Sequence, residues 1–252
     1  MNLHAHWLGH STVLLEIDGM RVITDPVLSN RIGVYVGVGN IGPKRLTDPP
    51  LTAKQLPPID LILLSHAHMD HFDIPTLRRL ESPRTTVVTA RHTSDLLRVH
   101  RYRKVQELAW NEYVQVGSLR IKALQVRHWG ARMVTDRHRG YNGYLIESQE
   151  SGRRIVFGGD TAYTTAFREV RADVAIMPIG AYDPWIHHHC SPEQAWRMSC
   201  DMGADLFLPI HHQTFPLGRE GFYEPIERFV DAAGNSRSQI MVHQVGERWQ
   251  AA

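Results

Sequence analysis

The sequence contains little cysteine and no long apolar run, and each absence excludes a class of protein. Its two cysteines, Cys190 and Cys200, are too few for a disulfide framework. No stretch approaches the roughly 18 consecutive apolar residues of a membrane span. The first residues also lack the basic start and apolar core of a signal peptide. We therefore expect a reduced, cytoplasmic protein without a transmembrane segment.

The chain also lacks an excess of charge of either sign. Lys and Arg number 28 against 26 Asp and Glu, which gives a formal net charge of +2. Nucleic-acid affinity comes largely from Lys and Arg contacts to phosphates, so this balance predicts no nucleic-acid partner. We find no linker and no break in composition, and therefore expect a single domain over residues 1–252.

Histidine is abundant by contrast. The chain has 16 histidines, more than its 8 tyrosines or 7 phenylalanines. Histidine is the commonest protein ligand for transition metals, so this excess directs attention to a metal site.

The hydrophobic pattern predicts short strands separated by turns. Asp18-Gly19 between two apolar runs is a strong hairpin signal, and apolar runs such as 59–64, in which Asp60 is the one polar residue, are typical of buried strands. The predicted strands cover 13–17, 20–24, 59–64, 113–116, 119–126, 144–147, 154–157, 174–179, 206–210 and a last strand around 239–244.

Three helix starts and one long loop complete the prediction. Asp73 before Ile74-Pro75 is a helix N-cap, and Ser191-Pro192-Glu193-Gln194 has the sequence of a capping box. Residues 225–233 form the last predicted helix. The glycine-rich residues 27–45 show no clean period and predict a long loop, of the kind that often acts as a lid.

The run Ser65–His71, which directly follows the predicted strand 59–64, contains His66, His68, Asp70 and His71. An apolar core could not satisfy the donors and acceptors of so many polar side chains. Zinc is normally held by His nitrogen and carboxylate oxygen, and this run offers both. A His-rich surface loop is the alternative, which the position after a buried strand disfavours.

Further candidate ligands follow other predicted strands. His128, Asp160 and the pair His211-His212 each stand just beyond an apolar run. Strand ends that deliver polar residues to one edge of a sheet place them where α/β proteins bind ligands. Singly, each residue could be a hydrogen-bonded histidine or a turn aspartate. Together with the run at 66–71 they predict a site for two metals.

This pattern resembles the metallo-β-lactamase fold hydrolases. The run His-x-His-x-Asp-His is followed by a later His, a Gly-Asp and a final His, as in that family. Trp7-Leu8-Gly9-His10-Ser11, Thr24-Asp25-Pro26, His128-Trp129 and Gly159-Asp160-Thr161-Ala162-Tyr163 look like its branch of N-acylphosphatidylethanolamine-hydrolysing phospholipases D. The ascorbate-6-phosphate lactonases are near neighbours. The resemblance extends from about Trp7 to Phe229.

The resemblance implies an α/β (α+β) fold, a four-layer αβ/βα sandwich with a binuclear metal site at the sheet edge. One metal would bind His66, His68 and His128, and the other Asp70, His71 and His211, with Asp160 bridging both. His211 is preferred to His212 because it directly follows Pro209-Ile210, as the family's last histidine follows its strand. Two divalent transition metals are implied, with zinc first and manganese or iron suited to the same ligands.

The resemblance also implies roles around the metals. Asp25 and His10 would hold ligands by hydrogen bonds, although Asp25 could equally be a turn residue. His189 resembles a family histidine near the substrate and would act as an acid, with His187 and His188 as rivals. Asp70 and Asp160 would take part in catalysis as well as binding metal.

Four residues are candidates for substrate binding. Tyr163 and Trp129 lie close in sequence to predicted ligands, although packing in the core is an alternative for both. Lys44-Arg45 ends the glycine-rich segment, whose Val34–Ile41 portion is apolar. Apolar residues beside a basic pair suit a small or lipid-like ester with an anionic head. Peripheral membrane contact and a homo-oligomer stay open.

The sequence thus predicts a metal-dependent hydrolase. Two metals close together can share a hydroxide and stabilise both attacking and leaving oxygens. The family's true β-lactamases lack the bridging aspartate, which disfavours penicillin as substrate. A phosphodiesterase of the phospholipase D-like type is the leading hypothesis. A lactonase acting on a sugar-phosphate or acyl-homoserine lactone is the alternative, and a nuclease is disfavoured by the balanced charge.

Overall fold

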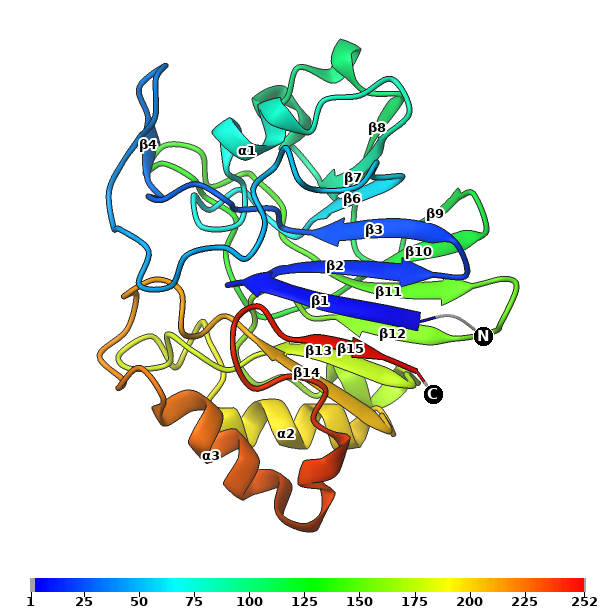
Figure 1. Cartoon of the computed structure of the whole chain (residues 1–252), viewed down its shortest axis with the longest axis vertical. Coiled ribbons are helices and arrows are strands. Elements are labelled where there is room, and N and C mark those ends of the chain that lie inside the picture. The colour runs from blue at the N-terminus through cyan, green and yellow to red at the C-terminus, as the bar shows by residue number, and fades with distance from the viewer. Residues whose placement is uncertain (1–2, 252) are drawn as a thin grey trace.

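Two β-sheets face each other in the computed structural model, which describes residues 3–251 (Figure 1). The first sheet has the strand order β15-β1-β2-β3-β6-β7-β8. In that order its strands are Arg248–Gln250, Leu3–Gly9, Thr12–Ile17, Met20–Thr24, Leu61–Leu64, Thr86–Ala90 and Lys104–Leu108. The second has the order β14-β13-β12-β11-β10-β9. Its strands are Leu206–Ile210, Val174–Pro178, Arg154–Phe157, Gly143–Ser148, Leu119–Leu124 and Tyr113–Val116.

Helices cover the outer faces of both sheets. Helix α1 (Ile74–Arg79) packs through Leu77 on the outer face of the first sheet. Helices α2 (Pro192–Asp201) and α3 (Glu224–Ala233) cover the second sheet beside β13 and β14 (Figure 1). The 3₁₀ segments are Ser94–Leu96, Val99–Arg101, Ala166–Glu169 and Gly234–Gln239. This order of helix, sheet, sheet and helix confirms the predicted four-layer fold.

The largest apolar cluster fills the space between the two sheets. It includes Trp7 and Leu15 from the first sheet and Tyr144 and Phe157 from the second, all fully buried. Strands buried on both faces read as continuous apolar runs, which explains the pattern at β6 and β13.

The predicted helix caps are present. Asp73 accepts a hydrogen bond from the backbone N–H of Thr76 at the start of α1. Ser191 and Gln194 form the reciprocal capping box at the start of α2. Each cap fixes the direction in which the chain leaves the sheet edge, immediately after a segment that carries candidate ligands.

Strand direction brings the candidate ligands to one edge. β3 and β6 are parallel, and β1 points the same way because β1-β2 and β2-β3 are antiparallel. In the second sheet β12, β13 and β14 are parallel, and β10 shares their direction through two antiparallel pairings. Their carboxyl ends are therefore followed by His10, Asp25, His66, His128, Asp160 and His211.

Some predicted elements differ from the structure. The strand predicted around 239–244 is wrong, because that segment makes only an isolated bridge between Ile240 and Phe207, and the terminal strand is β15. The sequence analysis did not predict β1, β7 or β8. The segment 27–45 is largely a loop, as predicted, but its tip is a hairpin of β4 (Val34–Tyr35) and β5 (Asn40–Ile41).

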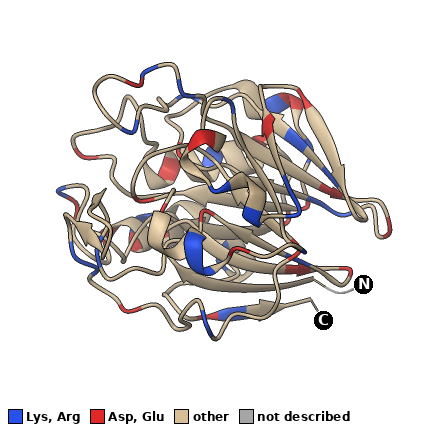
Figure 2. Cartoon of the chain, turned by 90° about the horizontal axis from the view of Figure 1, so that it is seen from above, with Lys and Arg blue, Asp and Glu red and all other residues tan. Residues whose placement is uncertain are grey.

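Charge is distributed over the molecule, as the balanced composition predicts. Figure 2 shows Lys and Arg segments interspersed with Asp and Glu segments over the helices, strands and loops. Within residues 3–251, none of the helices has the length and apolar character needed to span a membrane.

Candidate metal centre

The segment after β6 turns sharply and gathers its polar side chains. The backbone N–H groups of His71 and Phe72 both donate to the carbonyl of His68, at 3.1 and 2.8 Å. This turn places His66 and His68 on one side of the site and Asp70 and His71 on the other.

The first group of candidate ligands consists of His66, His68 and His128. Nε2 of His66 lies 2.8 Å from Nδ1 of His68, and Nε2 of His128 lies 3.2 Å from the same Nδ1. Four ligands around a zinc ion at ~2.05 Å stand about 3.3 Å apart. The three nitrogens therefore have nearly the spacing that a shared metal requires.

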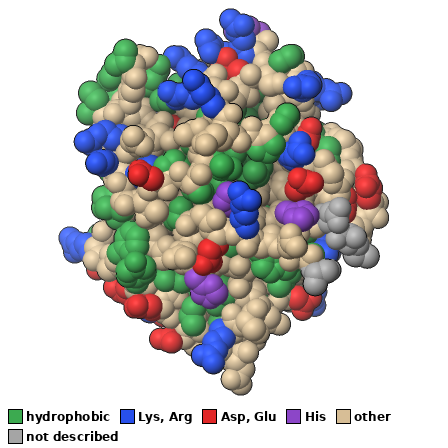
Figure 3. Space-filling view, in the orientation of Figure 1, with side chains coloured by type: hydrophobic (Ala, Val, Ile, Leu, Met, Phe, Trp, Pro, Cys, Tyr) green, Lys and Arg blue, Asp and Glu red, His purple; other side chains and the backbone are tan. Residues whose placement is uncertain are grey.

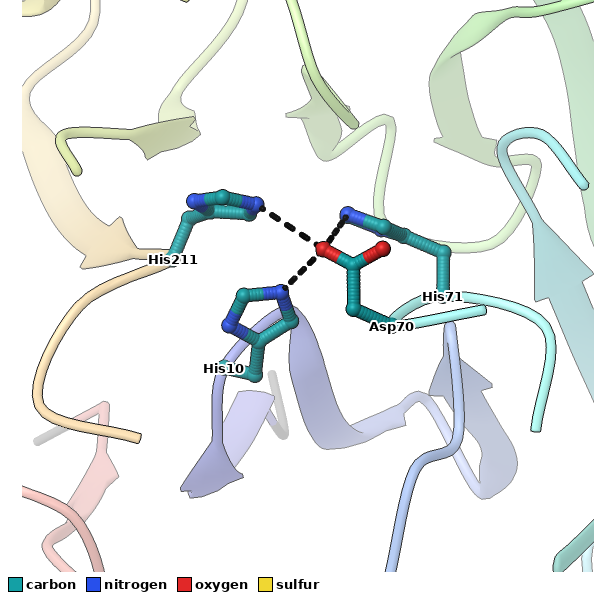
Figure 4. Close-up of side chains that lie close together, drawn as sticks. All are labelled: His10, Asp70, His71 and His211. Atoms are coloured by element: carbon teal, nitrogen blue, oxygen red, sulfur yellow. Dashed lines mark hydrogen bonds and ion pairs between the residues drawn. The ribbon is translucent and has the colours of Figure 1, made fainter. Parts of the chain in front are cut away.

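The second group consists of Asp70, His71 and His211, with His10 beside them (Figure 4). Oδ2 of Asp70 lies 3.4 Å from Nε2 of His71 and 3.5 Å from Nε2 of His211. Figure 4 shows the imidazoles pointing toward this oxygen from three separate parts of the chain. These spacings again approach the edge of a tetrahedron around one metal.

Asp160 lies between the two groups. Its Oδ2 is 3.1 Å from Nε2 of His71 and 3.2 Å from Nε2 of His211. The same oxygen is 3.7 Å from Nε2 of His128 and 3.9 Å from Nε2 of His66. A single carboxylate thus reaches both groups, which is the position that the sequence analysis gave it.

Several residues around the two ligand groups have left-handed backbone conformations. His10, Asp25 and His211 have φ values of 51°, 32° and 66°, a region that non-glycine residues rarely adopt. Gly159 has φ +58°, and a Cβ there would lie 2.7 Å from Cβ of Ser65. Such strain clusters at functional sites, where the surrounding structure holds it in place.

One buried carboxylate orients a histidine in each group. Oδ2 of Asp25 lies 2.6 Å from Nδ1 of His71 and accepts a hydrogen bond from Oγ of Ser65 at 2.5 Å. Oγ of Ser65 lies 2.8 Å from Nδ1 of His66. With both Nδ1 atoms as donors, the Nε2 lone pairs of His66 and His71 face the metal positions. The sequence analysis missed Ser65, whose signal is its place between the strand and the first ligand.

His10 contacts two of the candidate ligands. Its Nε2 is 3.0 Å from Oδ2 of Asp70, and its ring centroid is 4.0 Å from that of His211. The backbone carbonyl of His10 accepts a hydrogen bond from the N–H of His211 at 3.0 Å. His10 therefore positions both Asp70 and His211.

The electrostatics of the two groups suit metal ligands. Burial, together with neighbouring histidines, lowers the pKa of His66 and His128 well below the usual range, which leaves their rings neutral. Burial alone would raise the pKa of Asp70 and Asp160, but the surrounding imidazoles outweigh it and lower both pKa values. Metals bind neutral imidazole and ionised carboxylate, so the first group and both aspartates are in the state that binds metal. In the second group burial alone would lower the pKa of His71 and His211, but Asp160 and Asp70 outweigh it and raise both pKa values, that of His211 to about 9. These two rings therefore carry a proton that a bound metal would displace.

The donor set itself supports a metal. Several polar atoms that face the site are buried without a hydrogen-bond partner, among them Nε2 of His71, Nε2 of His211 and Oδ1 of Asp160. Orphaned buried polar atoms of this kind require a partner such as an ion. Nitrogen and oxygen ligands at these spacings fit divalent transition metals.

The structure separates His211 from His212. His211 faces the second group, while the ring of His212 packs against Trp7 with centroids 4.5 Å apart. A Cβ on Gly180 would lie 2.1 Å from the carbonyl oxygen of His211, so only glycine permits this approach. Neighbouring residues at a strand end point in opposite directions, so only one of the two histidines reaches the site.

His189 lies at the site and its two neighbours do not share its position. It is 7% exposed, and its Nδ1 is 3.8 Å from Oδ2 of Asp160. His188 instead uses its backbone carbonyl, which lies 2.9 Å from Nδ1 of His128, and His187 is exposed. Burial lowers the pKa of His189 to about 4, so its ring is neutral at neutral pH.

The four candidates for substrate binding lie in different surroundings. Trp129 is at the site, with its ring centroid 4.8 Å from that of His68. Tyr163 packs against the apolar cluster beneath α2, and its hydroxyl accepts from Arg168 at 3.4 Å. Lys44 is exposed. Arg45 is 6% exposed and donates to the carbonyl of Val27 at 3.1 Å, so its guanidinium is engaged inside the protein.

Comparisons with known proteins agree with this geometry. A family model described as "Beta-lactamase superfamily domain" matches residues 20–212. An uncharacterized protein of Mycobacterium tuberculosis is 34% identical over 98% of this chain and 68% of its own length. The N-acyl-phosphatidylethanolamine-hydrolyzing phospholipase D 1 of Caenorhabditis elegans is 30% identical over 99% of this chain and 76% of its own length.

A solved structure shares the fold over the whole chain. Igni18, described as a metallo hydrolase from the archaeon Ignicoccus hospitalis, superposes with a TM-score of 0.74 at 19% identity. The alignment covers 100% of this chain and 99% of that chain. With the family match and the two groups of ligands, these likenesses identify the chain as a metal-dependent hydrolase of the metallo-β-lactamase superfamily.

Proposed function

We propose that this hydrolase is a phosphodiesterase of the phospholipase D-like type that acts with two divalent metals, most readily zinc. The observation that carries the proposal is Asp160, whose Oδ2 lies within 3.9 Å of imidazole nitrogens from both ligand groups. A carboxylate in this position can hold two cations close together. The 30% identity to a phospholipase D favours a phosphodiester over other esters.

The metals and the protein have separate tasks in this reaction. When bound, two metals would supply Lewis acidity toward water and toward the phosphoryl group. His66, His68 and His128 would hold one metal, and Asp70, His71 and His211 the other. Asp25, Ser65 and His10 fix the orientation of these ligands by hydrogen bonds.

His189 is placed to contact the leaving group. Its ring stands 5.1 Å from that of His128 and 5.2 Å from that of His211, so it faces both ligand groups. The N–H of a neutral imidazole there donates a hydrogen bond to the leaving oxygen, which gains charge as the bond to phosphorus breaks. His189→Ala should slow substrates with alkoxide leaving groups much more than p-nitrophenyl esters. Equal losses on both would contradict this role.

Exposed apolar side chains stand on several loops of the molecule and favour a substrate with an apolar part. Val38 at the tip of the β4–β5 hairpin is 97% exposed, and Val134 in the loop after Trp129 is 83% exposed. Trp185 and Phe222 are partly exposed on two further loops. Figure 3 shows hydrophobic side chains gathered at the corner of the hairpin, with Lys and Arg beside them. Apolar surface of this kind marks a binding region.

The loop after Trp129 borders a hollow beside the metal centre. A cavity of about 650 Å³ is lined by Trp129, Met133, Val134, Arg137 and His188. Its walls are largely apolar with one cation, which suits an acyl or aryl group on an anionic ester. Trp129 forms the wall between this cavity and His68.

The experiment that tests the proposal compares two substrate classes on protein of known metal content. We expect hydrolysis of bis(p-nitrophenyl) phosphate to exceed that of simple and acyl-homoserine lactones in kcat/KM. The Asp160→Asn variant should lose this activity. Efficient lactone opening with negligible phosphodiesterase turnover, in fully metallated protein, would overturn the proposal in favour of a lactonase.

A further inference from the structure

A second cavity lies beneath the β4–β5 hairpin, apart from the metal ligands. Its volume is about 490 Å³, and it is bounded by the hairpin on one side and by α1 and residues 52–54 on the other. None of the candidate metal ligands lines it. The kind of ligand that this cavity binds therefore has to be inferred from its own lining residues.

Three cations line this cavity without a counter-charge. They are Arg31, Lys54 and Arg79, and no carboxylate is among the lining residues. Within residues 3–251 none of the three has a carboxylate within ion-pair distance. Some other surface arginines are paired, for example Arg98 with Glu81 at 2.6 Å. The positive charge in the cavity is therefore unneutralised by the protein.

Two of the cations are held in place by the backbone. Arg31 donates through Nη1 to the carbonyl of Gly42 at 2.9 Å, and Arg79 through Nη1 to the carbonyl of Pro75 at 2.9 Å. Each bond uses one of the five N–H groups of a guanidinium and leaves the rest available. A partly fixed guanidinium loses less freedom when it binds an anion.

The nearest buried carboxylate is already occupied. Asp73 lies behind the cavity, fully buried, and accepts hydrogen bonds from Ser29 at 2.6 Å and Asn40 at 2.7 Å. Both oxygens are thus taken up by neutral donors, and the bonds tie the walls of the cavity to the start of α1. Asp73 shapes the cavity but does not pair with its cations.

We propose that this cavity binds a phosphate monoester. Guanidinium groups match phosphate oxygens in geometry, and three cations suit a dianion better than the single charge of a diester or a carboxylate. The volume accommodates a small ligand such as glycerol phosphate. The same chemistry is offered by a soluble phosphate ester and by the headgroup of phosphatidic acid.

Calorimetric titration of the metal-loaded protein with glycerol 3-phosphate at low salt tests the site. We expect the variant R31Q/K54Q/R79Q to bind at least tenfold more weakly than the unchanged chain. The matched control R84Q/R101Q/R103Q removes the same charge from exposed arginines outside the cavity and should change binding less than threefold. Lys54→Gln alone, which breaks no side-chain hydrogen bond or ion pair among residues 3–251, should weaken binding measurably.

Two further experiments are needed. One separates binding in the cavity from binding at the metal centre, and the other distinguishes a soluble phosphate ester from a lipid headgroup. Because bound metals can also hold phosphate, the titration is repeated with Asp160→Asn, which should keep the cavity's binding. Sedimentation with vesicles of phosphatidylcholine, with and without phosphatidic acid, reports the headgroup. Binding of either probe that is lost in R31Q/K54Q/R79Q supports the site.

Three results would overturn the inference. The first is that neither glycerol 3-phosphate nor phosphatidic acid vesicles bind. The second is that both triple variants bind these probes equally well. The third is that all binding disappears with Asp160→Asn and persists in R31Q/K54Q/R79Q, which would place the phosphate at the metal centre.

Discussion

Oδ2 of Asp25 lies 2.6 Å from Nδ1 of His71, and the same oxygen accepts a hydrogen bond from the hydroxyl of Ser65. Ser65 in turn contacts Nδ1 of His66 at 2.8 Å. One carboxylate thereby orients a ligand in each of the two groups. The two groups of candidate ligands are therefore coupled through the side chain of Asp25.

This coupling predicts unequal effects of two variants. Asp25→Asn should weaken both metals by about 10- to 100-fold, because His66 and His71 lose their common anchor. Ser65→Ala should weaken chiefly the metal at the His66 group, because His71 keeps its direct contact with Asp25. Chelator competition gives the two affinities. Unchanged affinities in Asp25→Asn would contradict the role of this carboxylate.

A second prediction concerns the close packing of Gly159 against Ser65 and Asn142. Gly159→Ala should destabilise the protein and release metal, because the new Cβ would meet Ser65 and the carbonyl of Asn142 at 2.7 and 2.9 Å. Gly152→Ala is the matched control, since Gly152 has φ +71° but open space around it. The Gly152→Ala control should lower the free energy of unfolding by about 1 kcal/mol, from backbone strain alone. Urea unfolding of both variants measures the difference, and equal losses would contradict the close packing.

The ion pair between Glu193 and Arg228 predicts a pH-dependent contribution to stability. Nε and Nη2 of Arg228 lie 2.8 and 2.9 Å from the two carboxylate oxygens. Arg228, and then Ser191, lowers the pKa of Glu193 to about 2. Because this pKa is depressed on folding, the stabilisation is present above the unfolded pKa of ~4.3 and is lost as the pH falls toward 2.

Glu193→Gln should therefore reduce the free energy of unfolding at pH 7 by roughly 0.5–1 kcal/mol, since solvent screens this exposed pair. The deficit should shrink between pH 5 and pH 3. Glu150→Gln, at an exposed carboxylate that forms no ion pair among residues 3–251, is the control and should show no such trend. Denaturant unfolding across this pH range gives the result, and a deficit independent of pH would count against the pair.

The exposed hairpin predicts an effect confined to substrates with an apolar chain. Val38→Asp should raise KM for acylated phosphodiesters at least threefold, because a charge replaces apolar surface at the hairpin tip. The kcat/KM for bis(p-nitrophenyl) phosphate should stay nearly unchanged. Val99→Asp, at an exposed valine in the 3₁₀ segment 99–101, is the control. Equal effects on both substrates would exclude a specific role of the hairpin.

The sequence predicted the parts of the site that local pattern encodes. The run at 66–71 follows an apolar strand, and both helix caps have unmistakable residue types, so these elements could be placed without coordinates. Strand β1 escaped prediction because histidines alternate with its apolar residues, so no continuous apolar run marks it. The terminal strand was misplaced because the apolar residues near 241 are buried by packing against β14 without a ladder.

Other features depend on contacts between distant segments. Arg45 is buried because Phe215 and Val27 converge on it from different parts of the chain, which no local pattern reveals. The direct approach of His10 to Asp70 spans 60 positions in the sequence. The cations around the second cavity are likewise brought together by the loop of residues 27–54 folding over α1.

The most direct test of the binuclear centre is the metal content per chain, measured by elemental analysis after resupply and followed alongside phosphodiesterase activity. We expect close to two transition metals per chain, with activity rising as the second is added. His211→Ala should lower the content, while His212→Ala, whose ring packs on Trp7, should retain both metals. One metal or none in the unchanged chain, or loss of metal in His212→Ala alone, would contradict the two-metal site.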